Sequence, residues 1–249
     1  MTEEIVATAG AIRAERYHDC VALFVAGSLV RGEGTANSDL DLVVVFPSLK
    51  AAYRESFRFA GYPVEAFVHD PETLEYFFVE VDRACGIPAL PQMVAEGLEV
   101  PAANTLSQAL KRRARTVLEA GPPALDAEGE ARLRYVVTDV LDDLREPRSY
   151  QELLGSGAQL FEVLANYYFR SRGLWSARGK AIARGLIRND PAFADAYHRA
   201  FEQLFKAADP SQVISLTERL LESRGGLLFD GYKSDAPEGW RSTVNKTAV

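Results

Sequence analysis

A Gly-Ser pair and an Asp-x-Asp pair have the residue types and the spacing that chemistry on a phosphate group needs. Gly27 and Ser28 are followed, after ten residues, by Asp39 and Asp41. A residue without a Cβ lets backbone N–H groups approach an anion, and the Ser28 hydroxyl can donate to a phosphate oxygen. Carboxylates two residues apart in a strand point to the same face. They could share two divalent cations, about 3.5–4 Å apart, that clamp the entering and leaving oxygens of a phosphoryl transfer.

A third carboxylate, Glu65, extends this pattern. It lies in an otherwise apolar stretch between Val64 and Ala66. We expect it beside the two aspartates, either as a further metal ligand or as the general base that takes a proton from an attacking hydroxyl. Hard oxygen ligands favour Mg²⁺. The alternatives are structural: Asp-x-Asp is common at strand starts, Gly-Ser marks many turns, and a lone Glu is often the solvent-facing residue of an edge strand. The combination favours a functional site.

The elements that must position these residues alternate along the first third of the chain. Short apolar runs rich in β-branched residues predict strands, and amphipathic patterns predict helices. The predicted strands are 21–26, 40–46 and 62–69, and the predicted helices are 3–17, 50–60 and a further one that begins at Pro71. In this prediction Gly61 ends the helix at 50–60.

The chain changes character after an irregular segment that contains Gly86, Pro88, Pro91 and Pro101. Apolar residues then recur at steps of three and four, which predicts helices and no strands. These helices are predicted at 103–120, 130–146, 150–171, 178–188, 191–207 and 211–224. We therefore expect an α+β protein, with an N-terminal mixed-sheet domain over residues 1–100 and an all-helical bundle domain over residues 101–249. A cleft between the two domains would hold the ligands.

Basic residues are concentrated in one part of the helical half. From Val163 to Asn189 there is no Asp or Glu, whereas six Lys and Arg residues occur. Lys180 and Arg184 lie one helical turn apart on one face and are predicted to bind the phosphates of a nucleotide. Arg31, in the loop that follows Ser28, is assigned to the same nucleotide. The alternative is a solvated basic face that pairs with acidic neighbours.

The bulk properties restrict the partners. The net charge of −7 argues against general affinity for a nucleic-acid backbone, and two cysteines without a CxxC pair predict neither a disulfide framework nor a zinc site. No signal segment and no window of about 18 apolar residues is found, so we expect a soluble, cytoplasmic protein with no membrane partner. The oligomeric state is not predicted.

The motif GS(x10)DLDLVVVF at 27–46 resembles the DNA polymerase beta type nucleotidyltransferase superfamily. Together with VEAFVHD at 64–70 and a helical C-terminal half, it is similar to the aminoglycoside adenylyltransferases, including the streptomycin and spectinomycin modifying group. The resemblance is specific over roughly residues 20–70 and only architectural beyond them.

That resemblance implies an adenylyltransferase that uses two Mg²⁺ ions and moves AMP from ATP to a hydroxyl of a small molecule, with a role in antibiotic resistance. It also implies that Glu65 is the catalytic base and that a basic residue of the helical domain contacts the nucleotide. Two alternatives remain open. One is an antitoxin-like enzyme that adenylylates a protein, and the other is a non-catalytic relative that binds nucleotides.

Overall fold

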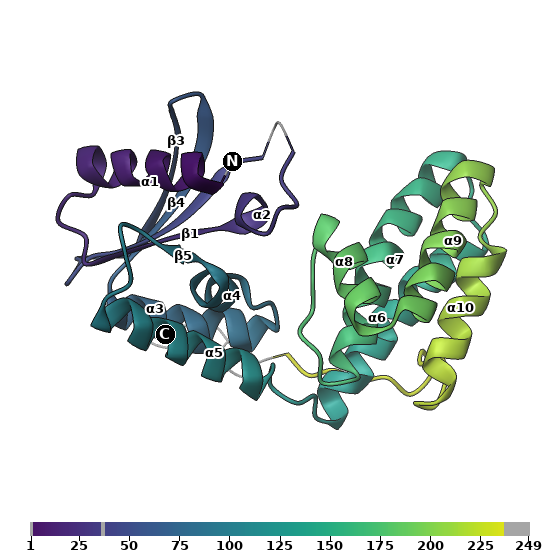
Figure 1. The fold of residues 1–249 in the computed structure, drawn as a ribbon. Coiled ribbons are helices and arrows are strands. Elements are labelled where there is room, and N and C mark those ends of the chain that lie inside the picture. The colour runs from purple at the N-terminus through teal and green to yellow at the C-terminus, as the bar shows by residue number, and fades with distance from the viewer. Residues whose placement is uncertain (1, 36–37, 237–249) are drawn as a thin grey trace, which may run out of the picture. The chain divides into compact units, whose positions relative to one another are not determined.

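The computed structural model describes residues 2–35 and 38–236 (Figure 1). The described residues form two compact units, the first over residues 2–124 with Gly173–Ser176 and the second over Leu125–Arg172 with residues 177–236. The sequence places the change of domain near residue 100. In the structure the first unit extends to Ala124, because helix α5 (Thr105–Ala120) packs against α4 (Ala89–Glu96).

A five-stranded mixed sheet forms the centre of the first unit. Its strands lie in the order β3-β4-β2-β1-β5, and β2 and β4 are the parallel neighbours in this order. The bounds are β1 Ala22–Ala26, β2 Leu40–Val45, β3 Tyr53–Phe59, β4 Tyr62–His69 and β5 Leu98–Glu99. The predicted α+β class is confirmed, and the three predicted strands correspond to β1, β2 and β4.

The predicted helix at 50–60 is wrong, because residues 53–59 form strand β3. Phe57 and Phe59 are two residues apart and pack against the core on one face of the sheet, which is the period of a strand. Ala60 and Gly61 have φ angles of 48° and 88° and join β3 to β4. Positive φ at both central residues is the geometry of a two-residue hairpin turn, so Gly61 turns a hairpin rather than ending a helix.

Helices cover both faces of the sheet (Figure 1). Helix α1 (Thr2–Arg16) contributes Ile5, Ala9 and Ile12 to a core that includes Leu23 and Leu42. A second core, on the opposite face, packs Phe24, Val43 and Val45 against buried side chains of the helices after β4. Successive residues of β1 and β2 therefore alternate between the two cores. The same alternation in β2 and β4, whose residues Leu40, Leu42, Val64 and Ala66 lie in the first core, places Asp41 and Glu65 on the second face.

The segment between β4 and α5 is more regular than the sequence predicts. It contains α3 (Pro71–Tyr76), a π-helical stretch (Phe77–Arg83), α4 and β5. The carboxylate of Asp70 caps α3 by accepting from the backbone N–H of Thr73 at 2.8 Å, and Asp82 accepts from the backbone N–H of Leu90 at 2.6 Å. The helix predicted to begin at Pro71 is thus confirmed as α3, whereas the start of α4, which the Asp82 carboxylate satisfies, is not predicted.

The described residues of the second unit form helices and connecting loops. The helices are α6 Ala127–Arg145, α7 Tyr150–Arg170, α8 Lys180–Asn189, α9 Pro191–Ala207 and α10 Ser211–Glu222. Each corresponds to a predicted helix, and the prediction of α5 is confirmed as well. Residues 237–249 of the predicted helical domain lie outside the described residues. No helix among the described residues is long and apolar enough to cross a membrane.

Strand β4 ends on a buried histidine. His69 is 3% exposed, its ring meets the Phe77 ring edge-on at 4.9 Å, and its Nδ1 has no hydrogen-bond partner among the described residues. Burial lowers the pKa of His69 from 6.5 to about 4, although neighbouring Asp70 acts to raise it. The folded protein therefore holds this imidazole neutral at pH values at which the unfolded chain protonates it.

We expect the first unit to lose stability as the pH falls from 6.5 to 4. The unfolded chain binds a proton in this window and the folded chain does not, which costs roughly 2–4 kcal/mol. Urea unfolding in a Trp240→Phe background, followed by the fluorescence of Trp175, measures this change. His69→Phe should remove most of the pH dependence, whereas His18→Gln, at an exposed histidine, should retain it. If the free energy of unfolding depends on pH equally with and without His69, this histidine is not the source of the pH dependence.

Candidate functional site

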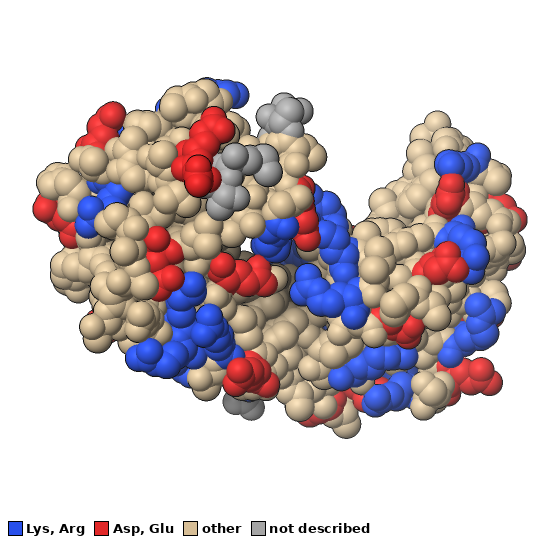
Figure 2. Space-filling model, viewed as in Figure 1, with Lys and Arg blue, Asp and Glu red and all other residues tan. Residues whose placement is uncertain are grey.

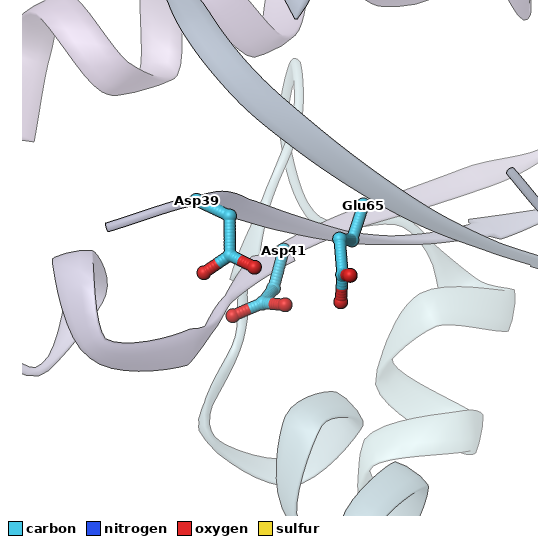
Figure 3. Close-up of side chains that lie close together, drawn as sticks. All are labelled: Asp39, Asp41 and Glu65. Atoms are coloured by element: carbon cyan, nitrogen blue, oxygen red, sulfur yellow. The ribbon is translucent and has the colours of Figure 1, made fainter. Parts of the chain in front are cut away.

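Three carboxylates converge at one end of the sheet (Figure 3). Asp39 directly precedes β2, Asp41 is its second residue, and Glu65 is the fourth residue of β4. Each side chain offers an oxygen, and these oxygens all lie within 4.8 Å of one another. The structure thus brings together the three acids that the sequence predicts as a group.

The register of β2 and β4 brings the acids together. Asp41 lies opposite Glu65 in the parallel ladder, with Leu40 opposite Val64 and Leu42 opposite Ala66. The four apolar partners are fully buried on the α1 side, so both carboxylates must point to the other side. All three acids are partly exposed, which leaves them accessible to an ion.

Gly27 lies against the carboxylate of Asp41. The preceding residue, Ala26, pairs with Asp41 in the β1–β2 ladder. Gly27 has a φ of +82°, and a Cβ placed on it would lie 1.9 Å from the Asp41 Oδ2 atom. A side chain at this position would therefore meet both backbone strain and a direct clash. The chain follows with a single helical turn, α2 (Gly27–Val30).

Ser28 and Arg31 make contacts within the loop region. The Ser28 hydroxyl is largely buried and donates to the Ser38 Oγ at 3.3 Å, which links the Gly-Ser turn to the residue before Asp39. Arg31 forms ion pairs with Glu33 at 3.2 Å and Glu96 at 3.4 Å. The predicted roles of these two residues toward a nucleotide stay predictions.

Arg54 is a site residue that the sequence analysis does not identify. It lies on β3, and its Nη2 donates to Glu65 Oε1 at 2.5 Å. Its guanidinium carbon lies 4.9 Å from the centre of the Phe67 ring. Because the sequence analysis predicts a helix at 50–60, it does not place Arg54 in the sheet. The alternating aromatic residues of β3 and the Ala60-Gly61 turn are the signals that could have placed it there.

The two predicted phosphate-binding residues of the helical half, Lys180 and Arg184, lie on α8 in the second unit. Lys180 is exposed at the start of the helix, and Arg184 is partly buried one turn later. Their spacing agrees with the predicted helix, and their contact with a nucleotide stays a prediction.

The donor set suits a hard divalent cation. Three carboxylate oxygens within 4.8 Å of one another can ligate one ion or bridge two, and none of the three ligands is a thiolate or an imidazole. Oxygen-only sets favour Mg²⁺ or Mn²⁺ over zinc. A cation would also reduce the repulsion among three negative charges held this close together. Asp39, Asp41 and Glu65 therefore fit a divalent metal.

The match to a known protein family agrees with this geometry. Residues 12–81 match the model of a family described as "Nucleotidyltransferase domain", a range that contains the three acids, Gly27 and Arg54. No significant match is found among curated proteins. Among solved structures, the chain is similar to a nucleotidyltransferase-like protein from Exiguobacterium sibiricum, with 14% identity and a TM-score of 0.45 over 88% of this chain and 75% of that chain. The family match supports nucleotidyl transfer as the general activity.

We expect Gly27→Ala to impair the metal site. The new Cβ would occupy the position of the Asp41 carboxylate, so this side chain must move away from Asp39 and Glu65. Titration of the purified protein with Mn²⁺, followed by electron paramagnetic resonance, should show affinity reduced by about tenfold or more, equivalent to roughly 1.4 kcal/mol.

Gly32→Ala is the matched control for this change. Gly32 also has a positive φ, +72°, but a Cβ there meets nothing within 4 Å. It introduces similar backbone strain, about 1 kcal/mol, without the clash. Equal loss of Mn²⁺ affinity in the two variants would show that strain in the loop, rather than contact with Asp41, limits the site.

Proposed function

We propose that this protein is a Mg²⁺-dependent nucleotidyltransferase that moves AMP from ATP to a hydroxyl of a small molecule. The observation that carries the proposal is the convergence of Asp39, Asp41 and Glu65 beside the Gly27-Ser28 turn. Carboxylates grouped at the end of a sheet, next to a glycine whose backbone closely approaches one of them, suit the binding of metal and triphosphate together.

On the donor side, Asp39 and Asp41 would hold the cations. When bound, these ions supply Lewis-acid stabilisation to the phosphate oxygens on which negative charge develops. The Ser28 hydroxyl and the N–H groups of the Gly27-Ser28 turn bind the triphosphate in this proposal. Lys180 and Arg184 are assigned to the leaving pyrophosphate because two cations one helical turn apart match its charge.

On the acceptor side, Glu65 accepts the proton of the attacking hydroxyl. The acceptor oxygen forms a bond to the α-phosphorus of ATP, and the bond from that phosphorus to the bridging oxygen breaks. Pyrophosphate leaves with the electron pair, and the proton passes from the Glu65 carboxylate to solvent. Every atom of ATP is thus found either in the nucleotidylated acceptor or in pyrophosphate.

An aminoglycoside-like antibiotic is the proposed acceptor class, which would give the protein a role in antibiotic resistance. The support is the sequence resemblance of residues 20–70 to the aminoglycoside adenylyltransferases. Such acceptors are polyhydroxylated cations, and the acidic balance of the chain, −7, is compatible with attracting them.

We expect purified protein incubated with ATP and Mg²⁺ to add AMP to a member of an aminoglycoside panel. Mass spectrometry would detect the gain of one nucleotide, and parallel reactions with GTP, CTP and UTP would define the donor. Asp41→Asn should abolish the product because it removes a metal ligand. A gain of AMP on proteins alone would favour the protein-adenylylating alternative. The proposal of an enzyme would be contradicted if neither aminoglycosides nor proteins gain AMP and if Asp41→Asn leaves Mg²⁺-dependent ATP binding unchanged.

We expect Glu65→Gln to reduce kcat by roughly 100-fold or more, with ATP affinity within about twofold of the wild type, because general-base catalysis contributes factors of this size. The amide keeps the shape of the side chain but cannot accept the proton. Steady-state kinetics and equilibrium ATP binding separate the two effects. Glu72→Gln, at an exposed glutamate of α3, is the control. An unchanged kcat would exclude Glu65 as base, and a large loss of Mn²⁺ affinity would identify it as a metal ligand.

A further inference from the structure

The β3–β4 hairpin places the positively charged side chain of Arg54 next to the acidic site. Ser56 lies directly opposite Glu65, and Arg54 lies opposite Phe67 in the same antiparallel ladder. Arg54 and Glu65 are therefore diagonal neighbours on one face of the sheet, a separation that a long side chain spans. The Arg54 Nη2 reaches Glu65 Oε1 at 2.5 Å.

Two contacts hold the Arg54 guanidinium. The Phe67 ring lies beneath it at 4.9 Å, which supports the planar group by a cation–π interaction, and the Glu65 carboxylate accepts from its edge. The Arg54 side chain is 55% exposed and the Glu65 side chain is 27% exposed. Solvent screening makes such an ion pair a small contributor to folding stability, so stability alone does not account for a charge at this position.

The charge of the site suggests a different role. Asp39, Asp41 and Glu65 place three carboxylates within 4.8 Å, so each one is repelled by the other two. A positive group in contact with Glu65 offsets part of that repulsion and restricts the rotation of the carboxylate. The same positive charge repels any divalent cation that enters the site. Figure 2 shows several groups of Lys and Arg side chains, with Asp and Glu beside them, on the visible face. The contact with Glu65 is what distinguishes Arg54 from other exposed basic residues.

We propose that Arg54 is the positioning residue of Glu65 and the internal counter-charge of the metal site. Arg54 holds the Glu65 carboxylate in one orientation toward the aspartates, and its positive charge weakens the binding of a divalent cation next to Glu65. The part that concerns turnover rests on the proposed nucleotidyl transfer. The part that concerns cation affinity rests on the carboxylate geometry alone.

The direction of the effect on metal binding follows from Coulomb's law. A unit charge next to a divalent ion, at the effective dielectric constant of a partly exposed site, changes affinity by about three- to tenfold. Removing the charge should therefore tighten cation binding. Turnover should change in the opposite sense, because Glu65 loses the contact that orients it.

The test is a Mn²⁺ titration of the full chain, without nucleotide, followed by electron paramagnetic resonance. Arg54→Gln should bind Mn²⁺ about three- to tenfold more tightly than the wild type, and Arg54→Lys, which keeps the charge, should remain within about twofold. Arg58→Gln is the matched control. Arg58 lies on the same strand, is exposed, and is the other diagonal neighbour of Glu65, opposite Pro63. It should remain within about twofold of the wild type.

Each outcome decides the proposal. Unchanged or weaker Mn²⁺ binding by Arg54→Gln would overturn it, and so would an equal gain in Arg58→Gln, which would show a general effect of surface charge. Thermal unfolding checks that the variants are folded. If Arg54→Gln does not fold, Arg54→Met, which also removes the charge, takes its place in the titration. With an acceptor in hand, Arg54→Gln should lower kcat about tenfold or more while the KM for ATP stays unchanged. Failure to find an acceptor would count against the proposed function. The Mn²⁺ titration would still decide whether Arg54 weakens cation binding, because it needs no acceptor.

Discussion

The parallel pairing of β2 with β4 is the interaction on which the site depends. It places Asp41 opposite Glu65 and brings Asp39 to the same end of the sheet. A shift of one residue in either strand would turn its carboxylate into the apolar core on the α1 side. Buried Leu40, Leu42, Val64 and Ala66 prevent that shift, because their burial is lost when the register changes. The hydrophobic core therefore determines the geometry of the polar site.

Grouping three carboxylates opposes folding, and the location of the group limits this cost. The acids lie where β2 and β4 begin on the second face, and each stays partly exposed to solvent. Water and bound cations can therefore offset the repulsion that a fully buried cluster would retain. Arg54 provides a further offset from β3. The inner part of the same face, with Val43 and Val45, packs against apolar side chains of the helices.

The close approach of Gly27 to Asp41 joins the two halves of the proposed donor site. Pairing of Ala26 with Asp41 brings the end of β1 beside the acids, and the absence of a Cβ at Gly27 leaves room for the Asp41 carboxylate. In the proposed function, the Gly27-Ser28 turn after β1 would bind the triphosphate, and the acids of the neighbouring strands would hold the metal. Two adjacent ladders, β1–β2 and β2–β4, are sufficient to assemble the site.

Local sequence patterns are sufficient to predict α1, the strands β1, β2 and β4, the start of α3, the helices from α5 onward, and the grouping of Asp39, Asp41 and Glu65. Each of these follows from a local pattern: a short apolar run, a repeat of three and four residues, or an acid at a fixed spacing. Tertiary structure decided what depends on partners distant in sequence. Residues 53–59 are a strand because β4 pairs with them, α5 belongs to the first unit because it packs on α4, and Arg54 reaches the site only across that pairing. A seven-residue segment of mixed polarity is compatible with helix or strand, and cross-strand hydrogen bonds and shared core contacts select between them.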